Sequence, residues 1–144
     1  MLQLFKQGRG REGHEIADAI ATLSDQPTEG NRQALYRELL QGSLFLATTS
    51  LPPGWADRGA VTLDQATTLP TLTSPAPDGT KALLAFTDHE QVRRRKADAS
   101  CFAMESRAVL ELVLAADFGA LIINPNGPWA AIPRVDVQRL LGSL

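Results

Sequence analysis

Two short apolar runs, each followed by a polar turn, stand out in the second half of the chain. Residues 82–86 read ALLAF and are followed by TDHE, and residues 119–123 read GALII and are followed by NPNG. Runs of this length that end in turn-forming residues are typical of buried β-strands. The pattern therefore predicts two strands whose ends reach the surface in turns.

Further segments carry strand patterns. SLFLATT at residues 43–49 predicts a strand, and residues 100–104 and 129–132 predict two more. Residues 69–73 and 81–86 flank a turn rich in Pro, Asp and Gly, which predicts a hairpin. NPNGP is expected to turn the chain back at the end of GALII, with Gly127 at a positive φ.

Helical periodicity, with apolar residues three and four positions apart, covers residues 16–23, 31–41, 109–116 and 137–141. Asn31 is expected to be the N-cap of the second helix, with Gly42 as the left-handed residue after its end. Gly119 is expected to close the third helix in the same way, and Pro133 suits the first turn of the last.

A further short helix is predicted directly after ALLAF. In TDHE, Thr87 can accept a hydrogen bond from the amide of Glu90, whose side chain can reach back to the amide of Thr87, and this is a capping box. The helix runs into the basic residues Arg93, Arg94, Arg95 and Lys96. Their charge suits the negative pole at a helix C-terminus.

Together these elements predict a single α+β domain in which helices cover a mixed β-sheet of five or six strands. Residues 1–13 contain three Gly and three basic residues without periodicity, which predicts a loosely ordered N-terminal segment before a domain at 14–144. A chain of 144 residues is of the usual size for one core.

Composition narrows the function classes. Hydrophobic residues make up 44% and charged residues 21% of the chain, as in ordinary globular proteins. The net charge of -2 gives no general electrostatic reason to bind nucleic acid or an anionic membrane. No apolar run approaches the roughly 20 residues of a membrane span. With Cys101 as the single cysteine, we expect a cytoplasmic protein.

The order of these elements resembles the N-terminal domain of the SseB family, the bacterial enhanced serine sensitivity proteins. The resemblance lies in LLAFTDHE, RAVLELVLAADFGALIINP and IPRVDVQRLL, and it covers roughly residues 31–142. It implies a compact domain of α and β structure with a mixed sheet, and it implies no catalytic residues. Family members often have a second, C-terminal domain, which is expected to be absent here or supplied by another protein.

Two groups of residues offer catalytic chemistry. Asp88, His89 and Glu90 combine acid, base and metal-ligand capacity, although a helix N-terminus accounts for the same residues. Cys101 could be a nucleophile if a cation or a helix N-terminus lowered its pKa, whereas Phe102 and Met104 beside it favour a packed strand residue. These groups define one alternative function, a thiol-dependent or small-molecule-processing enzyme.

The basic run at residues 93–96 defines a second alternative, which is phosphate or nucleic-acid binding. Consecutive helical residues are about 100° apart, so four of them do not form one flat patch. The run also lacks interleaved aromatic residues on which bases could stack. The sequence therefore does not favour nucleic acid as a partner.

The main functional prediction from the sequence is a non-enzymatic module that binds a protein partner or itself. Trp55 lies in a Pro-rich connection, and Asn124, Asn126 and Trp129 lie in or beside the NPNGP turn. Loops on a rigid scaffold often carry binding residues, and Trp is common among those that dominate binding energy. These four residues form the predicted binding site, with no cofactor and no metal.

Overall fold

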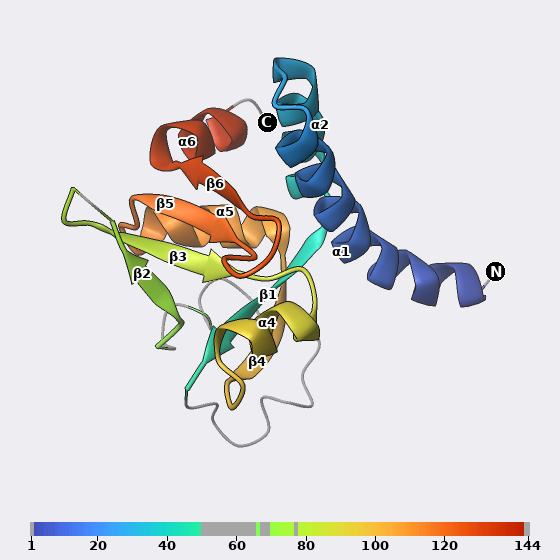
Figure 1. Cartoon of the computed structure of the whole chain (residues 1–144), viewed down its shortest axis with the longest axis horizontal. Helices are drawn as coiled ribbons and strands as arrows, with labels where there is room; N and C mark the ends of the chain where they lie inside the picture. Colours follow the sequence, from blue (N-terminus) through green and yellow to red (C-terminus); the bar gives the residue numbers. More distant parts are fainter. Residues whose placement is uncertain (1, 50–65, 67–69, 77, 143–144) are drawn as a thin grey trace.

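The computed structural model describes residues 2–49, 66, 70–76 and 78–142, with side chains from residue 14 onward. These residues form five helices and six strands (Figure 1). In chain order the elements are α1 (Leu2–Asp25), α2 (Glu29–Leu39), β1 (Ser43–Thr48), β2 (Thr73–Pro75), β3 (Lys81–Ala85), α4 (His89–Arg95), β4 (Ser100–Glu105), α5 (Ser106–Ala115), β5 (Ala120–Ile123), β6 (Ala130–Pro133) and α6 (Arg134–Gly142).

The α+β class is confirmed, but the strands form two sheets where the sequence predicted one. A four-stranded sheet has the order β2-β3-β5-β6, in which β3 and β5 are parallel and the outer pairs antiparallel. β1 and β4 form a separate antiparallel pair. The amides of Phe45 and Phe86 donate to each other's carbonyls at 2.8 and 2.9 Å, which joins β1 to the end of β3 at an isolated bridge.

The first strand of the predicted hairpin is displaced along the chain. β2 is Thr73–Pro75 and pairs with β3, whereas the sequence placed this strand at 69–73. Leu72, just before β2, bonds to both sheets. Its amide donates to the carbonyl of Ala47 in β1, and its carbonyl accepts from the amide of Leu84 in β3. This segment therefore lies where the two sheets meet.

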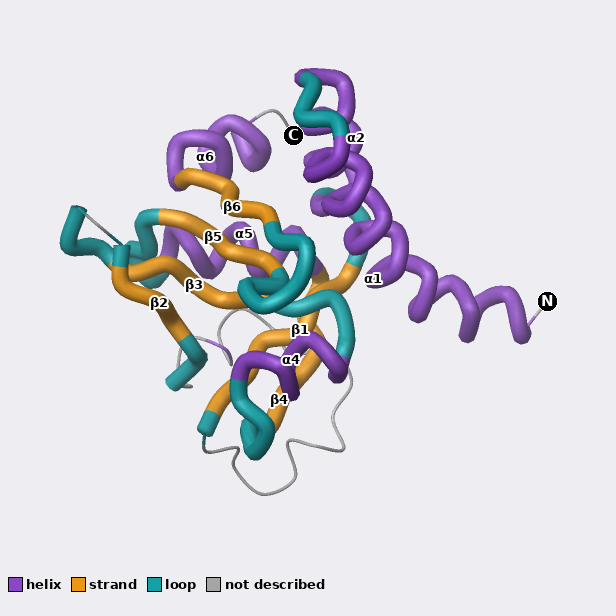
Figure 2. Tube along the Cα trace, in the orientation of Figure 1, coloured by secondary structure: helices purple, strands orange, loops and turns teal. Residues whose placement is uncertain are grey.

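β3 is buried on both faces, which explains why its sequence is apolar without alternation. Leu83 and Ala85 belong to the main core with α5. Leu84 and Phe86 belong to a second, smaller cluster with Val92 of α4. α5 and α4 thus cover opposite faces of β3, while α1 and α2 lie side by side and α6 lies beside β6 (Figure 2).

The N-terminal helix is longer than its periodicity predicted. Ile16 and Ile20 are buried, as expected for its apolar face. The backbone is helical from Leu2, although the sequence predicted loose order over residues 1–13. Glycines in a helix cost roughly 1 kcal/mol each, but no proline interrupts this segment. The first turns of α1 point away from the domain (Figure 1).

Two helix ends differ from the sequence-based predictions. The N-cap of α2 is Thr28, whose hydroxyl accepts from the amide of Asn31 at 3.1 Å, so the prediction of Asn31 as the cap is wrong. Gly42 does not take a positive φ. After α5 the left-handed residue is Asp117, with a φ of 62°, and not Gly119.

The predicted capping box at TDHE is also wrong by one residue. Asp88 is the N-cap of α4, and its carboxylate accepts from the amide of Gln91 at 2.8 Å. Thr87 is buried and has another partner, described below. The basic residues predicted at the end of this helix are in its last turn. None of the described helices has the length and apolar character needed to cross a membrane.

Loss of the α4 cap should be measurable. Asp88→Ala is expected to lower the free energy of unfolding by about 0.5–2 kcal/mol, because the Gln91 amide loses its acceptor. Urea melts of this variant should be compared with those of Asp98→Ala, since Asp98 forms only an exposed pair with Lys96 at 3.0 Å. Equal stability of the two variants would show that the cap contributes nothing.

Candidate functional site

Asn124 joins the ends of the two parallel strands. Its side-chain oxygen accepts from the amide of Thr87 at 3.0 Å, and its side-chain nitrogen donates to the Thr87 hydroxyl at 2.9 Å. Its own amide donates to Ala85 at 2.9 Å. Asn124 is only 3% exposed, so this residue of the predicted binding site bonds within the domain and is not open to a partner.

The NPNGP turn packs against α4. The amide of Gly127 donates to the carbonyl of Asn124 at 3.1 Å. Asn124, with a φ of 56°, takes the left-handed conformation that the sequence analysis assigned to Gly127. Gly127 lies close to α4: a Cβ there would lie 2.7 Å from Oε1 of Gln91, so a larger residue would displace the end of that side chain. Asn126 is exposed in the same turn.

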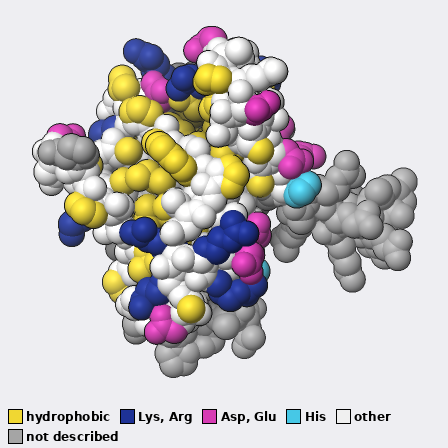
Figure 3. Space-filling view, in the orientation of Figure 1, with side chains coloured by type: hydrophobic (Ala, Val, Ile, Leu, Met, Phe, Trp, Pro, Cys, Tyr) yellow, Lys and Arg dark blue, Asp and Glu magenta, His cyan; other side chains and the backbone are white. Residues whose placement is uncertain are grey.

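Trp129 follows this turn and is 60% exposed. It lines an open groove of about 400 Å³. Hydrophobic side chains gather on the face of the molecule over β5 and β6 (Figure 3). The groove is lined by Leu23 and Ser24 from α1, Arg32, Leu35 and Tyr36 from α2, and residues 129–132. An exposed large aromatic side chain beside a surface hollow of mixed polar and apolar lining is typical of a binding surface.

Ser24, Arg32 and Tyr36 bring polar side chains to the groove. The Tyr36 hydroxyl donates to Oδ2 of Asp136 at 2.7 Å, which ties α2 to α6. Burial, followed by the bond to Asp136, raises the pKa of Tyr36 to about 12, so this hydroxyl stays neutral at physiological pH. Arg32 is the one charged residue among the described residues that line the groove, and its Nε lies 3.7 Å from the exposed Glu29 carboxylate.

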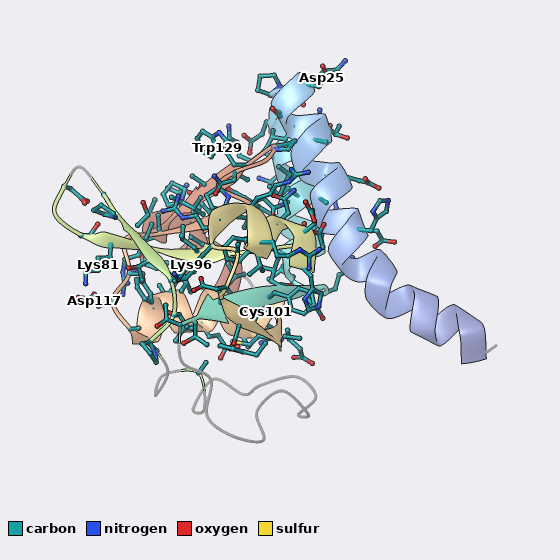
Figure 4. All side chains as sticks on the ribbon, turned by 60° about the horizontal axis from the view of Figure 1, so that its bottom comes forward. Asp25, Lys81, Lys96, Cys101, Asp117 and Trp129 are labelled. Atoms are coloured by element: carbon teal, nitrogen blue, oxygen red, sulfur yellow. The ribbon has the colours of Figure 1, made fainter. Side chains whose placement is uncertain are left out.

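The catalytic candidates lie elsewhere. Cys101 and Trp129 are on different sides of the molecule (Figure 4). Sγ of Cys101 lies 3.4 Å from Nδ1 of His89, whose ring is tilted by 50° against that of Phe45 with 4.6 Å between the ring centroids. Burial raises the pKa of the Cys101 thiol, and the nearby Arg93 opposes this only in part. The fold thus supplies a thiol and an imidazole in contact, but a thiol that is mainly protonated at neutral pH.

The other acidic and basic candidates have structural partners. Asp88 caps α4, and Glu90 binds Arg93 at 3.0 Å and Arg94 at 3.7 Å. Within the described part of the chain, no group of three or more His, Cys, Asp or Glu residues is placed to hold a metal ion.

Comparison with protein families agrees with the fold. The family model for the SseB protein N-terminal domain matches residues 16–138. The chain belongs to this family. The match confirms the sequence-based resemblance, and it covers every described strand and most of the helical structure. Searches of curated proteins and of solved structures found no match to the chain.

In this SseB N-terminal domain, the four predicted binding residues are not equivalent. Trp129 and Asn126 are both exposed and lie three residues apart in the sequence. Asn124 is buried, and Trp55 lies outside the described residues. Sequence reasoning missed the contributions of α1 and α2 to the groove. Arg32 and Tyr36 belong to ordinary helical periodicity, and no local signal links them to Trp129, which is far along the chain.

The thiol of the SseB domain should be slow to react. At pH 7 we expect the native protein to be labelled at Cys101 by an aromatic disulfide reagent much more slowly than the urea-unfolded protein, because burial raises the thiol pKa. His89→Ala is the matched variant, and it should leave the native rate almost unchanged. Fast native labelling that His89→Ala abolishes would instead identify an activated thiol.

Proposed function

We propose that this SseB N-terminal domain is a non-enzymatic, cytoplasmic module that binds a protein partner or a second copy of itself. The exposure of Trp129 beside the groove is the observation that supports this proposal. An indole held 60% in water gains free energy when a partner covers it, since burial of apolar surface drives most protein association. Trp is also enriched among the residues that dominate binding.

A thiol-dependent enzyme is the second candidate, and it is supported by the 3.4 Å contact between Cys101 and His89. The raised pKa of the thiol argues against it, because a nucleophilic cysteine needs a lowered pKa. Phosphate or nucleic-acid binding through residues 93–96 has less support. Arg93 and Arg94 pair with Glu90, and Lys96 pairs with Asp98.

The Trp129→Ala variant tests the binding proposal. We expect it to weaken self-association or partner capture at least about tenfold, the loss that follows from roughly 1.4 kcal/mol at a buried contact. Self-association is measured by light scattering after size exclusion, and partner capture by affinity purification from the native cell with mass spectrometry.

Arg94→Ala is the control, because Arg94 is exposed on α4 and does not line the groove. It should change binding little. Trp55→Ala tests the other predicted tryptophan in the same assays. If folded Trp129→Ala and Trp55→Ala variants both bind as the wild type does, the tryptophans are not the binding surface and the proposal is wrong.

A further inference from the structure

The strand that carries the groove lies at the edge of its sheet. β6 is the last strand in the order β2-β3-β5-β6, and it pairs with β5. The amide of Arg134 donates to the carbonyl of Gly119 at 3.0 Å. This bond shows which residues of β6 direct their backbone groups toward β5. Backbone groups face a neighbouring strand at every second residue, so Ala130 and Ile132 face β5. The N–H and C=O of Ala131 therefore point to the open side of the sheet.

The groove follows this open edge. Successive residues of a strand point to opposite faces of a sheet, yet Ala130, Ala131 and Ile132 all line the same groove. A hollow that touches three consecutive strand residues must run along the strand's edge and not over one face. α1 and α2 form its other wall. A chain segment in the groove would thus lie beside β6, within reach of the unpaired groups of Ala131.

The size of the groove favours an extended segment over a folded domain. Its volume of about 400 Å³ lies within the roughly 300–1,000 Å³ of ordinary ligand sites. The groove is bounded by β6 on one side and by α1 and α2 on the other. An added strand also satisfies the edge groups that a sheet otherwise leaves open to water.

The side chains around the groove define the chemistry of that segment. Trp129 and Leu23 offer apolar contact, and Arg32 supplies the only charge among the described lining residues. A guanidinium binds a carboxylate through two parallel hydrogen bonds. Resting on the proposed binding function, we infer that the groove takes an extended peptide segment of a partner protein. The segment adds as a strand beside β6, with an apolar side chain against Trp129 and a carboxylate against Arg32.

A displayed library of short random peptides tests this inference on the full chain. We expect the peptides selected by the wild-type protein to be enriched in Asp or Glu next to apolar residues. Synthetic copies are then titrated by fluorescence anisotropy. Ala131→Pro removes the outward N–H without removing a bond to β5, because proline is tolerated on an edge strand. This variant should bind at least about tenfold more weakly, and Ala131→Ser, which keeps the N–H, should bind as the wild type does.

Charge recognition is tested separately. Arg32→Gln should weaken binding of the selected peptides several-fold and reduce the salt dependence of binding, whereas Arg37→Gln should not. Arg37 is the matched control because it is exposed on the same helix, carries the same charge and does not line the groove. In the complex, hydrogen exchange at the amide of Ala131 should slow, and this change reports a strand beside β6 directly.

The outcomes separate the inference from the proposed function. If Trp129→Ala abolishes binding while Ala131→Pro and Arg32→Gln bind normally, the module binds through Trp129 but the added strand is refuted. A concentration-dependent dimer that Ala131→Pro leaves intact, with no peptide selected, would refute the peptide and leave self-association. If no peptide is selected and Trp129→Ala changes neither self-association nor capture, both proposals fail.

Discussion

Replacing Asn124 with alanine should lower the free energy of unfolding by about 2–4 kcal/mol. The Asn124 side chain makes two hydrogen bonds with Thr87 in a buried position, at 3.0 and 2.9 Å. Alanine leaves the buried amide of Thr87 without an acceptor, which costs about 1–3 kcal/mol. The backbone of the alanine must also adopt a φ of 56°, a left-handed conformation that Asn tolerates better than Ala.

Two further substitutions divide this effect into its parts. Asn124→Gly removes both hydrogen bonds but relieves the backbone, so it should be less destabilising than Asn124→Ala. Asn124→Asp keeps an acceptor for the Thr87 amide and tolerates the same φ, but it buries a carboxylate, so it should be mild only at a pH low enough to protonate that group. Urea melts give the three free energies. If all three variants lose the same stability, the pairing with Thr87 does not carry the effect.

The pairing of Asn124 with Thr87 shows where local reasoning stops. The sequence predicted a strand end and a turn at each residue, and both are present. The sequence predicted Thr87 as the N-cap because Glu90 follows three residues later. Asp88, which Gln91 follows at the same spacing, is the N-cap in the structure. Thr87 is then free to serve a partner 37 positions away, which no short-range pattern announces.

The core was more predictable than the groove. Burial depends on apolar periodicity, so Ile16, Ile20, Val109 and Val113 could be placed inside from the sequence alone. The groove instead depends on how α1 and α2 sit beside β6, and its residues come from separate parts of the chain. The split of six strands into two sheets is likewise a matter of tertiary geometry, since isolated bridges connect β1 to Phe86 and to Thr71, and no continuous ladder among the described residues joins it to the other sheet.

Arg134 is a second structural residue that the sequence did not indicate. It is the first residue of α6, where a positive charge is unfavourable because it faces the positive pole of that helix. The structure explains its position through another helix. Its guanidinium donates to the carbonyls of Val113 at 3.1 Å, Leu114 at 3.3 Å and Phe118 at 2.8 Å, at the C-terminal end of α5. The carbonyl of Val113 also accepts from the amide of Phe118 at 2.9 Å, so the guanidinium adds a second donor there. A cation also suits the negative pole at this end of α5.

Arg134→Ala should therefore lower the free energy of unfolding by about 1.5–3 kcal/mol, the range for hydrogen bonds to a charged group. Arg134→Lys should recover part of the loss, since an ammonium keeps the charge but cannot span three carbonyls. The exposed ion pair with Asp117 at 3.7 Å should add little, because Asp117 is 95% exposed. Urea melts measure all three proteins.

The control is Arg139→Ala, one helical turn or so further along α6, whose side chain is 78% exposed. A surface substitution of this kind is expected to change stability by no more than about 0.5 kcal/mol. A loss at Arg134→Ala no larger than at Arg139→Ala would mean that the end of α5 does not depend on the guanidinium. Because Arg134 does not line the groove, the folded Arg134→Lys variant should still bind as the wild type does. Stability and binding at Trp129 can thus be varied independently.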